Sequence, residues 1–252
     1  MDDAALTSIL GAGGLAIGGA CVGSFCATLA IRLTRGEQAL TGRSHCDHCQ
    51  TPLGLMQTIP IVSYGAARGK CLSCSGRIDP LHLVGEIGGA VVGALALSAR
   101  GPVESFLVGL VGFTLIISAL VDWRTKKLPD VATLIVGLCG LGLSAMVGQG
   151  QLIVSLIAAL TTGIILHLIR ATSQLVGRPV GLGWGDVKLM AALALWLGTE
   201  TPWMVAVASG LGLAGMFIIK PADGKLPFGP FIAASAFSIG VVMEAGLWPV
   251  LL

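Results

Sequence analysis

The chain has 252 residues, of which 54% are hydrophobic and only 11% are charged. Soluble domains carry about 25% charged residues, so this composition excludes an ordinary soluble protein and predicts an all-α polytopic membrane protein. The formal net charge of +2 is small, and we expect membrane lipid but no nucleic acid among the partners. The first six residues are acidic where a signal peptide would be basic, so we expect the first apolar segment to be retained.

An α-helix needs about 20 apolar residues to cross a bilayer. Apolar stretches of this kind predict about eight transmembrane helices, at residues 5–31, 82–99, 103–121, 131–148, 151–170, 186–199, 202–219 and 229–250.

The distribution of cations supports this count. With eight spans, the loops alternate between two faces, and fourteen of the fifteen Lys and Arg residues fall on one face, leaving only Arg100 on the other. Cytoplasmic loops are rich in Lys and Arg. We therefore predict that both termini lie outside and that the long 32–81 loop is cytoplasmic. The expected domains are a first membrane helix (1–31), a cytoplasmic domain (32–81) and a seven-helix membrane domain (82–252).

The 32–81 loop contains two CxxC pairs, Cys46 with Cys49 and Cys71 with Cys74. Two such turns can close a tetrahedral metal site, and about fifty residues bury little core of their own. Two disulfides are the alternative, but a cytoplasmic location argues against them. We therefore predict a structural zinc on the four thiolates, with His45 and His48 as bystanders.

Two aspartates occupy matching positions in the predicted topology. Asp122 ends the third span, and Asp186 opens the sixth directly after Gly183 and Gly185. Taken singly, they would be an ion-pair partner and a helix cap. Because both lie at the cytoplasmic face at similar depth, we predict a catalytic pair supported by Gly183, Gly185 and Lys188. Lys188 is two residues beyond Asp186, so it points away from it and is expected to reach the headgroups.

Two carboxylates that share a proton can serve as general base and general acid, the mechanism of aspartic peptidases. A proton-coupled membrane transporter is the alternative, since it also uses intramembrane aspartates. Transporters usually place such residues near the midplane in repeated halves, and no internal repeat is visible. A zinc-anchored membrane scaffold is a third reading, but it would leave the matching aspartates unexplained.

The sequence resembles the bacterial prepilin peptidases (type IV leader peptidases), a family of GxGD-type intramembrane aspartic proteases. The resemblance extends over nearly the whole chain. It is carried by GSF at 23–25 with Arg32-Leu33, the two CxxC pairs, Asp122 with Leu128-Pro129-Asp130, GWGDVKL at 183–189 and PFGPF at 227–231. Two departures from the family pattern are Cys26 where an Asn is usual and Thr34 where a Pro is usual.

The resemblance implies that Asp122 and Asp186 are the catalytic aspartates, in an enzyme of the bacterial inner membrane whose active site faces the cytoplasm. It implies as substrate the basic leader of type IV prepilins or type II secretion pseudopilins, cut after a glycine. Many members also N-methylate the new N-terminus with S-adenosylmethionine, an activity linked to the cysteine-containing region. The sequence does not indicate the oligomeric state.

Overall fold

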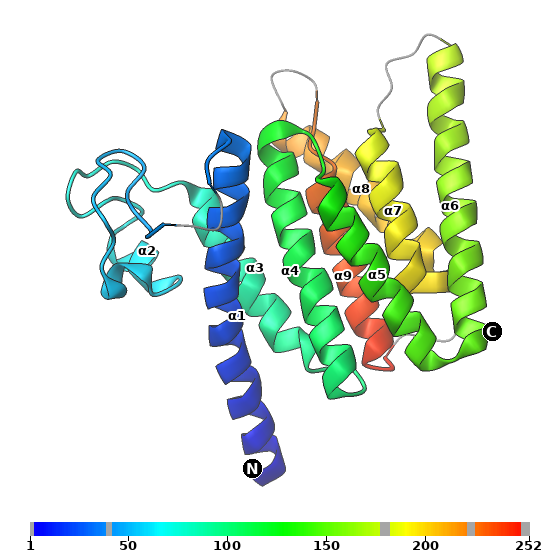
Figure 1. The fold of residues 1–252 in the computed structure, drawn as a ribbon, viewed down its shortest axis with the longest axis horizontal. Coiled ribbons are helices and arrows are strands. Elements are labelled where there is room, and N and C mark those ends of the chain that lie inside the picture. The colour runs from blue at the N-terminus through cyan, green and yellow to red at the C-terminus, as the bar shows by residue number, and fades with distance from the viewer. Residues whose placement is uncertain (1–2, 39–41, 177–181, 221–224, 248–252) are drawn as a thin grey trace. The chain divides into compact units, whose positions relative to one another are not determined.

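The computed structural model describes residues 3–38, 42–176, 182–220 and 225–247, and this part of the chain is helical without strands (Figure 1). Two compact units, Met1–Leu97 and Ser98–Leu252, are described separately. The first contains α1 (Asp3–Arg35), η1 (Leu55–Thr58), α2 (Val62–Ala66) and α3 (Pro80–Ala96). The second contains α4 (Pro102–Thr125), α5 (Asp130–Val147), α6 (Gln149–Leu175), α7 (Trp184–Leu197), η2 (Gly198–Glu200), α8 (Thr201–Ile219) and α9 (Gly229–Glu244).

In the part of the chain that the structure describes, each of the eight predicted apolar segments corresponds to one helix. Within the described residues, five helical stretches are long and apolar enough to cross a membrane: Gly11–Arg35, Pro102–Thr125, Asp130–Val147, Gln149–Leu175 and Trp184–Ile219. The last of these joins α7, η2 and α8, while α3 and α9 are apolar but shorter. The chain is therefore a multi-pass membrane protein, and the count of eight spans stays a prediction.

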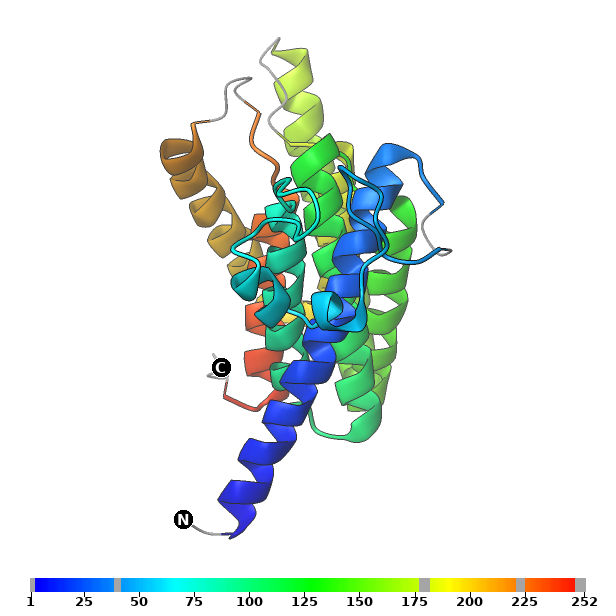
Figure 2. The ribbon, with the colours of Figure 1, turned by 90° about the vertical axis from the view of Figure 1, so that its left-hand side faces the viewer.

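In the first unit, α1 and α3 pack along a seam of glycines. A Cβ atom added at Gly19 would overlap the carbonyl oxygen of Gly89, and one added at Gly23 would overlap that of Gly85. A Cβ at Gly93 would meet the carbonyl of Leu15. Small residues spaced by four let membrane helices approach closely, so the sequence of this seam fixes how the two backbones meet. Figure 2 shows this unit from the side.

In the second unit, α7 lies in the centre and contacts α5, α6 and α9. Leu193 and Leu197 of α7, Met204 of α8 and Ile232 of α9 are fully buried. Toward the end of α7, the indole of Trp196 fills the space left by Gly240 of α9, where any Cβ would overlap the ring. This packing positions α7 and α9, which contribute to the site described next.

Candidate active site and metal centre

Asp122 lies in the last turn of α4 and is only 4% exposed. Its Oδ2 accepts a hydrogen bond of 2.7 Å from the backbone amide of Gly229, the first residue of α9. The helix ends three residues later, at Thr125, because Lys126 adopts a left-handed conformation (φ 55°); the amide of Lys126 donates to the Asp122 carbonyl. The end of α4 is thus joined to the beginning of α9 through one carboxylate.

Asp186 is the third residue of α7 and is 9% exposed. Its Oδ2 accepts a hydrogen bond of 2.9 Å from the amide of Gly183, the residue that caps the helix. The N-cap residue is therefore Gly183, whereas the capping alternative had assigned this role to Asp186. Asp186, at the third position of the helix, binds the N-cap amide with one carboxylate oxygen, and its other oxygen takes no part in this capping box.

The two glycines beside Asp186 allow close approach. A Cβ on Gly183 would lie 2.7 Å from Asp186 Oδ2, and a Cβ on Gly185 would lie 3.1 Å from the Cβ of Leu128. Leu128 belongs to the short connection that follows α4. Gly185 therefore lets the start of α7 pack against the segment that follows Asp122.

The two aspartates, 64 residues apart in the sequence, are close enough for the charge of Asp122 to act on Asp186. Lys126 also acts electrostatically on Asp122. Each of the two buried carboxylates thus has one oxygen held by a glycine amide. Such an arrangement suits acid–base chemistry.

Lys188, which was expected to reach the lipid headgroups, also has a partner within the protein. Its ammonium forms an ion pair with Asp130, the first residue of α5. The pair links the beginnings of α5 and α7 beside the aspartates. Lys188 could therefore support the site by holding the start of α7 in place; its ion-pair partner is Asp130 and not Asp186.

Three further residues hold the site, and sequence spacing gave no direct signal for them. Gly229, in the PFGPF motif, donates its amide to Asp122. Arg170 donates to the carbonyl of Leu182, directly before the capping glycine. The imidazole of His167 packs edge-on against Trp184, the first residue of α7, with 5.3 Å between ring centroids.

The four cysteines of the first unit converge. Their sulfurs all lie within 4.8 Å of one another, with 3.9 Å between Cys46 and Cys74 and 4.0 Å between Cys49 and Cys71. Tetrahedral zinc with Zn–S bonds of about 2.3 Å requires sulfurs about 3.8 Å apart, so this cluster fits a metal ion. The amides of His48 and Ser73 each lie 3.4 Å from a cysteine sulfur and can donate to a thiolate.

The neighbouring side chains agree with a closed four-sulfur site. The ring nitrogens of His45 and His48 lie near the carbonyls of Arg43 and Arg77, at 3.1 and 3.2 Å, and neither ring belongs to the cluster. Hydrogen bonds from Thr51 lower the pKa of the Cys49 thiol to about 6, which favours the thiolate that a metal binds.

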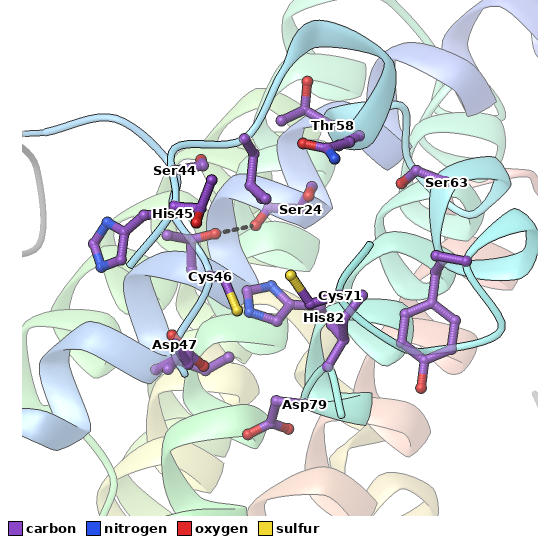
Figure 3. A pocket seen from close by; sticks show the side chains of 18 of the residues that line it. Ser24, Ser44, His45, Cys46, Asp47, Thr58, Ser63, Cys71, Asp79 and His82 are labelled. Atoms are coloured by element: carbon purple, nitrogen blue, oxygen red, sulfur yellow. Dashed lines mark hydrogen bonds between the residues drawn. The ribbon is translucent and has the colours of Figure 1, made fainter. Parts of the chain in front are cut away.

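A cavity of about 610 Å³ lies beside this cluster in the first unit. It is bordered by the C-terminal half of α1, the two cysteine loops, the segment between them and the start of α3. Figure 3 shows its polar lining, including Ser24, Thr58, Ser63, Asp79 and His82, with Cys46 and Cys71 at its wall. Sequence analysis did not predict this cavity, because its wall is assembled from segments that are far apart in the chain.

One wall of the cavity is fixed by a bidentate ion pair. Both nitrogens of the Arg35 guanidinium donate to the two oxygens of Asp47 at 2.9 Å. These hydrogen bonds lower the pKa of Asp47 below its usual value. Asp47 lies between Cys46 and Cys49 in the sequence. Its ion pair with Arg35 therefore holds the cysteine cluster beside the C-terminal end of α1.

The candidate active site of this multi-pass helical membrane protein is thus a buried pair of aspartates, each bound by a backbone amide. Comparison with known proteins identifies the family. Residues 17–99 match the bacterial peptidase A24 N-terminal domain, and residues 109–219 match the type IV leader peptidase family. The chain belongs to the type IV leader peptidase family, as the sequence motifs had indicated.

Several curated proteins are similar over most of the chain. The prepilin leader peptidase/N-methyltransferase of Burkholderia pseudomallei (strain 1026b) is 34% identical over 76% of this chain and 64% of its own length. The protein of the same name from Neisseria gonorrhoeae is 34% identical over 78% of this chain and 70% of its own. The type 4 prepilin-like proteins leader peptide-processing enzyme of Escherichia coli O78:H11 is 32% identical over 76% and 72%.

The chain thus spans slightly less than two thirds of the Burkholderia relative. No solved structure matches it significantly.

Proposed function

We propose that the protein is a prepilin leader peptidase that uses Asp122 and Asp186 as its catalytic pair. The observation that carries this proposal is the arrangement of these two buried carboxylates, which interact electrostatically while glycine amides hold one oxygen of each. The names of the relatives support prepilin processing.

In this mechanism the ionised aspartate takes a proton from a water molecule, and the water oxygen attacks the scissile carbonyl carbon. The protonated aspartate donates its proton to the carbonyl oxygen. As the peptide C–N bond breaks, the proton held by the first aspartate passes to the leaving amine. One hydroxyl of the gem-diol returns its proton to the second aspartate, which re-forms the carbonyl and restores both carboxyl groups to their starting states. The amides of Gly229 and Gly183 hold both carboxylates in place throughout, so little reorganisation accompanies the reaction.

The substrate follows from the family resemblance and from the depth of the site. A prepilin or pseudopilin has an apolar helix that fits the bilayer and a basic leader that stays in the cytoplasm. Its scissile bond, after a glycine, would then reach the membrane boundary, where Asp122 ends its helix and Asp186 begins its own. The cation distribution supports an active site that faces the cytoplasm, with both chain termini outside.

A second activity, N-methylation of the new N-terminus, is supported by the names of the relatives and by the cavity of the first unit. Its volume of about 610 Å³ is within the range of small-molecule sites, and we propose that it holds S-adenosylmethionine, which supplies an electrophilic methyl group when bound. Four thiolates leave no open coordination position, so the proposed zinc is structural.

Cleavage of a purified prepilin in liposomes tests the proposal. Asp122→Asn and Asp186→Asn keep the shape of the side chain and an acceptor oxygen but cannot perform the proton transfers, so each should lower kcat by at least about 1,000-fold. Glu104→Gln, at the other end of α4, is the matched control and should cleave normally. Mass spectrometry should locate the cut after the leader glycine, and with S-adenosylmethionine present it should detect one added methyl group.

Near-normal cleavage by either aspartate variant would refute the assignment of the pair. If no form of the folded protein cut a prepilin, the transporter alternative would take precedence, and proton flux into the same liposomes would be measured with both variants.

A further inference from the structure

One segment of the first unit is unusual for a cytoplasmic loop. Residues 51–67, which contain η1 and α2, carry no charged residue in seventeen positions. Leu55 is 88% exposed and Met56 is 79% exposed, and Val62, Ile59 and Ile61 are also exposed. In water, five exposed large apolar residues so close together would be costly and would promote aggregation.

Hydrogen bonds determine how deep this segment lies along the membrane helices. The amide of Ile61 donates to Glu86 Oε2 at 2.7 Å, and the hydroxyl of Ser24 donates to Glu86 Oε1 at 2.8 Å. The dashed bond at Ser24 in Figure 3 is the second of these. Ile61 therefore lies at the level of Ser24 on α1 and Glu86 on α3.

That level is well inside both helices. Ser24 precedes Arg32, the first cation of α1, by eight residues, or about 12 Å at 1.5 Å per residue. Glu86 is six residues, or about 9 Å, beyond the start of α3 at Pro80. One leaflet of the hydrocarbon core is about 15 Å thick. Figures 1 and 2 agree, since α2 lies beside the middle of α1 and not beyond its end.

The backbone of the segment is suited to such a place, because irregular backbone at membrane depth is tolerated where it lines a cavity. Residues 56–58, 60, 63–64 and 66–67 line the cavity of the first unit, and several of the segment's amides are bonded within the unit. The amide of Leu53 donates to Ser44, that of Gly54 to the side chain of Gln57, and that of Gln57 back to Gly54. In and directly after α2, the amides of Ser63, Gly65, Ala67, Arg68 and Gly69 likewise donate to carbonyls of the same unit.

The charges around the segment complete the pattern. Arg68 and Lys70 follow directly after its last residue, and Arg35 marks the end of α1 near the cysteine cluster. Cations at this boundary match the anionic headgroups of a cytoplasmic leaflet. The exposed apolar side chains of the segment and the cations beside it therefore indicate lipid as the partner of this surface.

We propose that residues 51–67 insert into the cytoplasmic leaflet, with Leu55, Met56 and Val62 in contact with lipid acyl chains. The four-cysteine cluster then sits at the headgroups, and the cavity between them opens at the membrane boundary. In this proposal, the part of the predicted 32–81 domain that carries the cysteines faces the cytoplasm, and residues 51–67 lie in the membrane. This inference stands independently of the peptidase activity.

Photo-crosslinking of the full-length protein in liposomes of phosphatidylethanolamine and phosphatidylglycerol tests the insertion. A benzophenone amino acid replaces Leu55 in one variant and Leu72 in another; Leu72 is also an exposed leucine but lies beside Cys71 in the cluster. After irradiation, mass spectrometry should detect phospholipid adducts at position 55 and several-fold fewer at position 72.

The absence of lipid adducts at position 55 in protein that retains its metal would overturn the proposal, as would equal labelling at both positions. A peptide adduct at position 55 would indicate a protein partner instead and would also overturn it. As a second measurement, Leu55→Asp should lower the Tm of the full-length protein in liposomes, whereas Leu72→Asp, at the other exposed leucine, should leave it unchanged. Equal Tm values for the two variants would contradict insertion.

Discussion

The carboxylate of Asp122 in α4 accepts a hydrogen bond of 2.7 Å from the backbone amide of Gly229 in α9. The two residues are 107 positions apart in the sequence. A Cβ atom at Gly229 would lie 2.9 Å from Asp122 Oδ2 and 3.0 Å from Asp122 Cβ. Glycine is therefore required at position 229 for this carboxylate to reach the amide.

Gly229→Ala should displace the Asp122 side chain and lower kcat/KM for prepilin cleavage by about 100-fold, because small misplacements at a catalytic group are costly. Overpacking should also lower the free energy of unfolding by about 1–3 kcal/mol. Steady-state kinetics and thermal unfolding in detergent measure the two effects.

Gly210→Ala is the matched control, since no atom lies within 4 Å of the position that its Cβ would take. It should leave both quantities nearly unchanged. Wild-type cleavage by Gly229→Ala would mean that the contact between Asp122 and Gly229 has no part in positioning the catalytic pair.

Replacement of one cysteine of the cluster should weaken zinc binding. A structural zinc contributes about 10–16 kcal/mol, and a quarter of this value corresponds to roughly 100-fold or more in affinity. Cys46→Ser should therefore lose zinc to a chelator that leaves the wild type loaded, as measured by atomic emission. Cys21→Ser, which alters an exposed cysteine of α1, should keep its metal; full zinc retention by Cys46→Ser would argue against a four-thiolate site.

The ion pair between Lys188 and Asp130 predicts that Lys188 acts on the position of α7 and not on the chemistry. Lys188→Met and Asp130→Asn should each lower kcat/KM by less than tenfold, and the double variant should be no worse than the worse single one. The coupling energy should be about 0.2–1 kcal/mol, as for other exposed pairs. A complete loss of cleavage in Lys188→Met alone would instead indicate direct action on the aspartates.

Glu244 near the end of α9 should be important for stability. Its carboxylate, 4% exposed, accepts hydrogen bonds from the Trp196 indole at 3.1 Å and from the Arg100 guanidinium at 3.0 Å, beside a cavity of about 150 Å³. Glu244→Ala removes the acceptor of the buried Trp196 indole and should cost about 1–3 kcal/mol, seen as a lower Tm; the Arg100 side chain is 53% exposed, so water can replace its partner. Glu200→Ala, in the less buried η2, should have little effect; equal Tm values would contradict this role.

Much of this molecule could be predicted from its sequence, because membrane insertion imposes simple rules. Apolar length predicted the positions of the long helices, and the CxxC spacing predicted which sulfurs would meet. The cation distribution put Asp122 and Asp186 at one face, and it also singled out Arg100, whose partner Glu244 only the fold revealed.

The remaining features depend on contacts between distant segments. Nothing in PFGPF indicates that the amide of Gly229 meets an aspartate on another helix. Residues 51–67 were assigned to the cytoplasm with the rest of the 32–81 loop, from the cation distribution. Nothing in their sequence indicates that the amide of Ile61 donates to Glu86 of α3. The Lys188 partner, Asp130, was likewise assigned to a helix start, which is correct but incomplete.

The glycine seam between α1 and α3 has a consequence for how this protein can change over evolutionary time. Most close contacts in a core can be repaired, since a larger residue on one side is accommodated by a smaller one opposite. Where Gly19 and Gly23 face Gly89 and Gly85, the opposing atoms are backbone, and no residue is smaller than glycine. A gain of even one methyl group there has no compensating substitution, so these positions should tolerate the least variation in the first unit.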